Sequence, residues 1–106
     1  MTAPLLNARM RLSIEFALTA ESGDASGRRR QEAGAVRLGM TGAEIDAARR
    51  GRSFDVLTSL ALALAIAARS AAPDRLREAR DRALGAGISA DMCREIEAMA
   101  ASPHTA

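Results

Sequence analysis

Side chains that could carry out redox or metal chemistry are scarce in this sequence. Cysteine and histidine occur once each, as Cys93 and His104. A single thiol cannot form an intramolecular disulfide, and its presence favours a reducing compartment. A metal site built from cysteine and histidine needs several of these residues at close spacing. We therefore expect no metal, no cofactor and a structural role for Cys93.

Arginine is the other group that could act on a ligand. Every basic residue apart from His104 is an arginine, and two clusters stand out, Arg28 to Arg30 and Arg49, Arg50 and Arg52. A guanidinium can bind a carboxylate through two parallel hydrogen bonds. Alternatively, these side chains are solvated at helix ends, where they favour the macrodipole. The net charge of +2 and the 2% aromatic content argue against nucleic-acid binding.

The composition predicts an all-α fold in one domain, residues 1–106. Alanine, arginine and leucine are the most frequent residues, and like glutamate they are strong helix formers. The pattern of apolar residues and capping signals predicts about six short helices. We expect them at 8–20, 28–38, 42–50, 54–70, from Pro73 onward, and at 90–101, with a loose lead-in at 1–7 and a frayed tail at 102–106.

The helix at 54–70 should be the centre of the core, with Ser53 as its N-cap. Its apolar run, Val56 to Ala68, is apolar on most faces but too short to span a bilayer. No apolar signal segment opens the chain, and we expect a cytoplasmic location without membrane contact.

Two short sequences end one helix and begin another. Gly39-Met40-Thr41 supplies a C′ glycine, an apolar residue and an N-cap, and Glu44 completes a capping box with Thr41. Gly87-Ile88-Ser89 repeats this order. The pattern is common αα-hairpin chemistry. An alternative treats the two hairpins as DNA-binding helix-turn-helix units, but the helices that follow offer no row of base-reading side chains.

Several short segments between Arg11 and about Ala101 form a recognisable pattern: the helix entering at Arg11, Ser22-Gly23, the run Ala35 to Ile45, Arg50 to Asp55, and the closing hairpin Ala83 to Ile96. Through these segments the chain resembles the carboxymuconolactone decarboxylase and alkylhydroperoxidase-D-like family. The resemblance implies a helical bundle and assembly into trimers or their multiples. Alanine-rich helix faces, which pack closely, also favour a homo-oligomer.

Redox members of that family use Cys-x-x-Cys, a following histidine and a glutamate on the preceding helix. An ungapped alignment places the cysteines on Asp24 and Gly27, the histidine on Gln31 and the glutamate on Leu12. None of these residues can perform the thiol chemistry. We therefore expect no thiol peroxidase activity and a non-redox module that binds a partner or ligand.

An enzyme on the same fold is the alternative. The decarboxylase branch of the family lacks the cysteine pair, and the resemblance implies proton-transfer residues and cations for an acidic small molecule. The candidates are Glu15, Asp24, Arg28, Arg29, Arg30, Gln31 and Glu32. The competing interpretation is that Asp24 and Ser26 cap the following helix and that the arginines are solvated.

Overall fold

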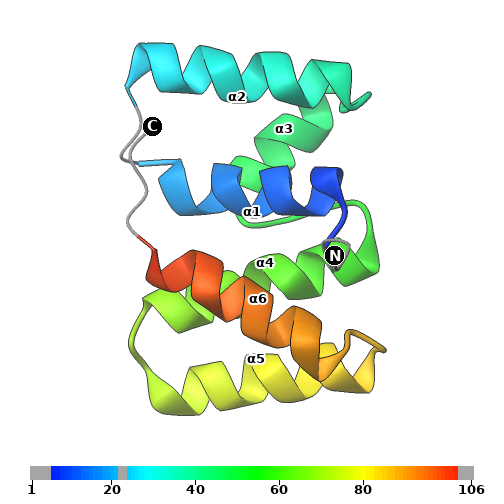
Figure 1. Ribbon diagram of the computed structural model, residues 1–106, viewed down its shortest axis with the longest axis vertical. Coiled ribbons are helices and arrows are strands. Elements are labelled where there is room, and N and C mark those ends of the chain that lie inside the picture. The colour runs from blue at the N-terminus through cyan, green and yellow to red at the C-terminus, as the bar shows by residue number, and fades with distance from the viewer. Residues whose placement is uncertain (1–5, 22–23, 103–106) are drawn as a thin grey trace, which may run out of the picture.

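The computed structural model describes residues 6–21 and 24–102, and this part of the chain is all-helical (Figure 1). The six helices are α1 Ala8–Thr19, α2 Ala25–Arg37, α3 Gly42–Arg49, α4 Val56–Arg69, α5 Pro73–Gly85 and α6 Ala90–Ala101. They form a globule of 34 × 30 × 26 Å. The prediction of an all-α fold with about six short helices is confirmed.

Helix α1 lies in the middle of the molecule and belongs to both of its halves. Figure 1 shows α2 and α3 on one side of it and α4, α5 and α6 on the other. The alternation of its apolar positions explains this placement: Met10, Ile14 and Leu18 face one half, while Leu12 and Phe16 face the other. Helix α1 therefore joins the half that contains α2 and α3 to the half that contains α4, α5 and α6.

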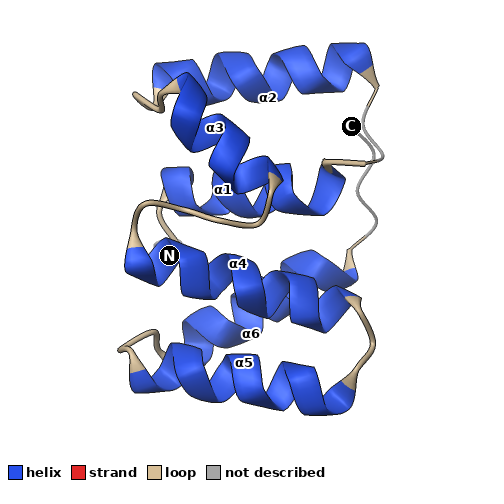
Figure 2. Cartoon of the chain, turned by 180° about the vertical axis from the view of Figure 1, so that it is seen from behind, coloured by secondary structure: helices blue, strands red, loops and turns tan. Residues whose placement is uncertain are grey.

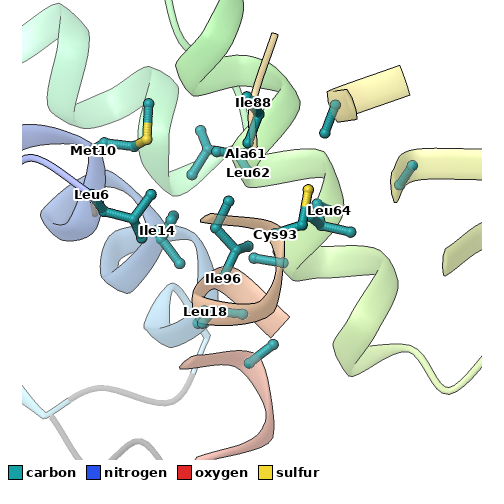
Figure 3. Close-up of a cluster of buried hydrophobic side chains, with 14 residues drawn as sticks. Leu6, Met10, Ile14, Leu18, Ala61, Leu62, Leu64, Ile88, Cys93 and Ile96 are labelled. Atoms are coloured by element: carbon teal, nitrogen blue, oxygen red, sulfur yellow. The ribbon is translucent and has the colours of Figure 1, made fainter. Parts of the chain in front are cut away.

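The larger apolar cluster surrounds α4, as the sequence predicts for its central apolar helix. Ala61, Leu62, Leu64 and Ala65 are fully buried there. Figure 3 shows the first three of them with side chains from α1 and from the closing hairpin. The other members are Leu6, Met10, Ile14, Leu18, Ala79, Ala83, Ile88, Cys93, Ile96 and Ala100.

One side of α4 is exposed to solvent. The sequence predicted instead that most faces of this helix would be buried. Val56 is 72% exposed, Ile66 is 43% exposed, and Ala63 between them is also exposed. These residues follow helical spacing and share one face. In Figure 2 this helix lies nearer the viewer than α6, which covers its opposite side.

The smaller apolar cluster holds α2 and α3 against α1. It consists of Phe16, Ala35, Met40, Ile45 and Ala48, with Leu12 packed beside it. Helix α2 contributes little to it, because only Gly27 and Ala35 of this helix are buried.

Both glycine-centred turns have the predicted geometry. Gly39 and Gly87 adopt φ angles of 81° and 104°, which side chains with a Cβ rarely adopt. Thr41 and Glu44 form a complete capping box, and the Ser89 hydroxyl accepts a hydrogen bond from the Met92 amide at 3.1 Å. These local signals located the starts of α3 and α6 correctly and the C-terminal end of α2 to within one residue.

Two predicted helix starts are wrong by two or three residues. Helix α2 begins at Ala25 because Asp24 caps it, and α4 begins at Val56 because Asp55 is its N-cap. The Asp55 carboxylate accepts from the amide and hydroxyl of Thr58 at 2.8 and 2.7 Å. Ser53, predicted as the cap, instead accepts from the Asp55 amide at 3.1 Å.

The predicted lead-in and tail are each partly structured. Leu6 is buried in the larger cluster and the Asn7 side chain caps α1, so describing residues 1–7 as loose is wrong for these two. Ser102 forms the C-cap of α6. Residues 1–5 and 103–106, including His104, lie outside the described residues.

Candidate functional site

The residues proposed from the sequence as ligand-binding do not converge. Asp24 is exposed, and its carboxylate accepts the Gly27 amide at 2.6 Å, as a cap does. Gln31 donates to the Thr19 hydroxyl at 3.0 Å. Arg28, Arg29 and Arg30 are exposed, and none forms an ion pair with the described residues. Glu15 is half-buried on α1, and the Glu32 carboxylate accepts a hydrogen bond from Arg49 at 2.5 Å.

The four positions that the sequence resemblance aligned with redox residues have structural roles here. Leu12 packs beside the smaller cluster, and its Cδ2 would lie 3.7 Å from a Cβ added at Gly34 of α2. Gly27 is buried in the first turn of α2. Gln31 joins α2 to α1 through the Thr19 hydroxyl, whereas Asp24 caps α2 itself. Ser22 and Gly23, which belong to the same segment, lie outside the described residues.

Cys93 is buried among apolar side chains of the larger cluster. Burial raises the pKa of its thiol, and Glu97 raises it further, although Arg80 acts in the opposite direction. Arg80 is fixed by two hydrogen bonds to Glu97, at 2.9 and 2.6 Å. The neighbouring hollow is small, about 170 Å³. The thiol is therefore protonated and poorly accessible, which suits packing rather than nucleophilic attack.

Helices α1, α3 and α4 run in the same direction, and this arrangement creates two chemically different ends. At their N-terminal ends Arg9 of α1 pairs with Glu44 of α3 at 2.8 Å. At their C-terminal ends Arg49 of α3 stacks over Phe16 of α1, 5.3 Å from the ring centre. Arg69 of α4 donates to the carbonyl oxygen of Leu18 at 2.6 Å. Figures 1 and 2 both show these helices side by side.

The C-terminal end contains a hollow of about 510 Å³ with an apolar floor and an arginine rim. Its lining residues are Ala17, Leu18, Ala20, Glu21, Arg49, Arg50, Gly51, Ile66, Arg69 and Ser70. Arg49 and Arg69 are held in place by the contacts described above. Arg69 satisfies a carbonyl group at the negative end of α1, where cations are stabilising, whereas Arg49 pairs with the Glu32 carboxylate in the middle of α2.

A second hollow of about 460 Å³ continues from the first along the exposed side of α4. The two share Gly51, Ile66 and Ser70, and the second adds Ala63, Ala67, Arg75, Glu78, Ala79 and Arg82. We call the two together the arginine groove. Ile66, exposed between them, forms the middle of its floor. The groove lies between α3 and α1 on one side and α5 on the other.

Gly51 shapes the floor of the groove. Its φ angle is 76°, and a Cβ at this position would lie 2.7 Å from Cδ1 of Ile66. The glycine therefore serves two purposes: it ends α3 in a left-handed conformation and allows Ile66 to approach the backbone.

The N-terminal end has a polar hollow of about 470 Å³, whose lining includes Asn7, Arg9, Ser13, Glu44, Asp55 and Thr58. Most of these groups are engaged in capping. Hydrogen bonds from Thr41 lower the pKa of Glu44, and hydrogen bonds from Thr58 lower that of Asp55. Their charges complement the positive ends of α3 and α4.

The arginine groove is not evident from the sequence. Arg49 and Arg50 stand out there only as part of a cluster at a helix end, and nothing singles out Arg69 or Arg75. The signal that could have found it is a combination: Gly51 between arginines, followed by an alanine and isoleucine stripe on one side of α4. Its recognition requires knowing that α1, α3 and α5 flank that stripe.

Neither a candidate metal site nor a membrane-spanning helix is found in residues 6–21 and 24–102. No group of three histidine, cysteine or acidic side chains there could hold a metal ion. No helix in this part of the chain is long and apolar enough to cross a bilayer.

Comparisons with protein-family models, with curated proteins and with solved structures give no match to this chain. The resemblance to the carboxymuconolactone decarboxylase and alkylhydroperoxidase-D-like family therefore stays a prediction from the sequence.

Proposed function

We propose that this chain is a non-redox helical module that binds a partner, on a fold of the carboxymuconolactone decarboxylase-like kind. The observation that carries the proposal is that Leu12, Asp24, Gly27 and Gln31 have structural roles in α1 and α2. A catalytic group must be within hydrogen-bond reach of a substrate atom. These side chains are used for packing and capping instead.

The alternative enzyme acting on an acidic small molecule has less support. Its candidate residues, Glu15, Asp24 and Arg28 to Arg30, line none of the hollows described above. General acid–base chemistry on an acidic substrate needs a carboxylate and a cation around one cavity. The arginine groove has the cations, but its carboxylates, Glu21 and Glu78, are exposed.

A peroxide-consumption assay with a dithiol reductant tests the non-redox proposal. Wild-type protein and Cys93→Ser should both give the rate of the protein-free control, because the only thiol is buried and its pKa is raised. Turnover clearly above that control and lost in Cys93→Ser would overturn the proposal.

We also propose that the module assembles with copies of itself in a closed arrangement, a trimer or a multiple of one. Support comes from Phe54, Val56 and Leu57, large apolar side chains that are exposed together at the N-terminal end of α4, with Phe54 75% exposed. Light scattering over a range of concentrations measures the assembly. A constant mass of 11.1 kDa, that of one chain, would contradict it.

A further inference from the structure

The arginine groove combines an apolar floor with positive charge that the chain does not balance. Five arginines and two glutamates line it, which is a formal excess of three positive charges. The whole chain carries only +2. The residues outside the groove therefore sum to a formal charge of −1.

Not all of this charge is available to a partner. The C-terminal ends of α1, α3 and α4 and the N-terminal end of α5 contribute about half a charge each, the first three negative and the last positive. The pairing of Arg49 with Glu32 removes one further charge. About one net positive charge remains, and it resides in particular side chains. Arg50, Arg75 and Arg82 form no ion pair with any described residue, whereas Arg80 on α5 is paired with Glu97.

The floor of the groove is apolar and exposed. Ala63, Ile66 and Ala67 of α4 form a strip along it, and Ile66 lies where the two hollows meet. Neither hollow is enclosed, so a small ligand would leave much of its surface in water, unlike ligands in typical pockets. An elongated strip of small and branched apolar residues between charged rims suits a helix lying in a groove.

We propose that the arginine groove is the docking site for an acidic amphipathic helix of a partner protein. The apolar side of that helix covers Ala63, Ile66 and Ala67, and its glutamates or aspartates meet Arg50, Arg75 and Arg82. The proposal rests on the proposed binding function and names the chemistry of its partner. Charge complementarity sets specificity and association rate, while the apolar strip supplies the buried area.

A labelled helical peptide with leucine and alanine on one side and glutamate on the other is the probe, titrated by fluorescence anisotropy into the full chain. Binding should be saturable and weaken with added salt. The same peptide with lysine in place of glutamate should bind at least about ten-fold more weakly, a difference of about 1.4 kcal/mol.

Charge reversal on α5 locates the binding surface. Arg75→Glu and Arg82→Glu should each weaken binding of the glutamate peptide several-fold. Arg77→Glu is the matched control, because Arg77 is exposed on the same helix but does not line the groove. Ile66→Ser should weaken binding through the apolar floor. Circular dichroism of each variant confirms that the helical fold is retained.

Three results would overturn the inference: no saturable binding up to about 1 mM peptide, equal binding of the lysine peptide, or an equal loss in Arg77→Glu. A single-stranded oligonucleotide that binds more tightly than the glutamate peptide would also overturn it, in favour of nucleic acid. None of these results touches the proposal of a non-redox module, which the peroxide assay tests separately.

Discussion

The two ends of the parallel helices α1, α3 and α4 differ in how completely their charged groups are used. At the N-terminal ends, Asn7, Thr41 and Asp55 each accept an amide hydrogen bond, and Glu44 completes the capping box. At the C-terminal ends, Arg49 and Arg69 have partners, but Arg50 has no ion pair among the described residues. The N-terminal ends, whose polar groups are satisfied within the chain, stabilise the fold. The C-terminal ends, where arginines without ion pairs lie beside an apolar floor, can bind a partner.

The largest expected effect on stability comes from the buried side of α4, one of the three helices that form both ends. Leu64→Asp places a carboxylate at a position with 0% exposure, which should cost several kcal/mol of unfolding free energy or leave the protein unfolded. Ile66→Asp, two residues further on and 43% exposed, is the control and should cost far less. Urea unfolding measures both; similar midpoints for the two variants would show that α4 is not oriented as described.

An intermediate effect distinguishes the glycines at the two ends. Gly39→Ala and Gly51→Ala both force a Cβ into a left-handed conformation, which should cost about 1–2 kcal/mol. Gly51→Ala should cost more, since its Cβ would lie 2.7 Å from Cδ1 of Ile66, whereas nothing lies within 4 Å at Gly39.

A double-mutant cycle isolates that contact. Ile66→Val removes Cδ1, so Gly51→Ala should cost less in the Ile66→Val background than in the wild type, and the two backgrounds should not differ for Gly39→Ala. Thermal unfolding measures all the variants. An equal cost of Gly51→Ala in both backgrounds would show that Ile66 does not lie against Gly51 on the floor of the groove.

The smallest effect is the pH dependence of the cap at the N-terminal end. Asp55→Ala should cost about 1 kcal/mol at neutral pH through loss of the N-cap. Because hydrogen bonds from Thr58 lower the pKa of Asp55 below its ordinary value of 3.8, this stabilisation is present above that value. It is lost as the pH falls through the lowered pKa. Chemical unfolding at neutral and acidic pH measures the difference in free energy of unfolding between wild type and Asp55→Ala. This difference should shrink in acid, and a constant difference would contradict the capping role.

The features that the sequence predicted are those set by neighbours in the chain. A capping box needs only Thr41 and Glu44, three residues apart, and a C′ glycine needs only the helix before it. Where two residues compete for one local role, the prediction was wrong: Ser53 was expected to cap α4, but the Asp55 carboxylate does so. Leu6 is buried because of distant helices, which no local signal indicates.

The candidate site was less predictable for the same reason. The predicted ligand residues were grouped by their closeness in sequence, at Glu15, Asp24 and Arg28 to Glu32. The arginine groove instead brings together residues from α1, α3, α4 and α5 that lie far apart along the chain. Arg50 and Arg82 lie along one continuous groove only because α4 packs between α1 and α5.

The position of α1 between the two apolar clusters has a consequence for folding during synthesis. Every residue of the smaller cluster precedes Arg49, so this cluster can close as soon as α3 has left the ribosome. The larger cluster needs Ile96 and Ala100, near the end of α6. Until those residues are made, Met10, Ile14 and Leu18 of α1 have no complete cover. The nascent chain thus carries an apolar helix face that waits for roughly half of the protein, and this interval is when chaperones or premature association can act on it.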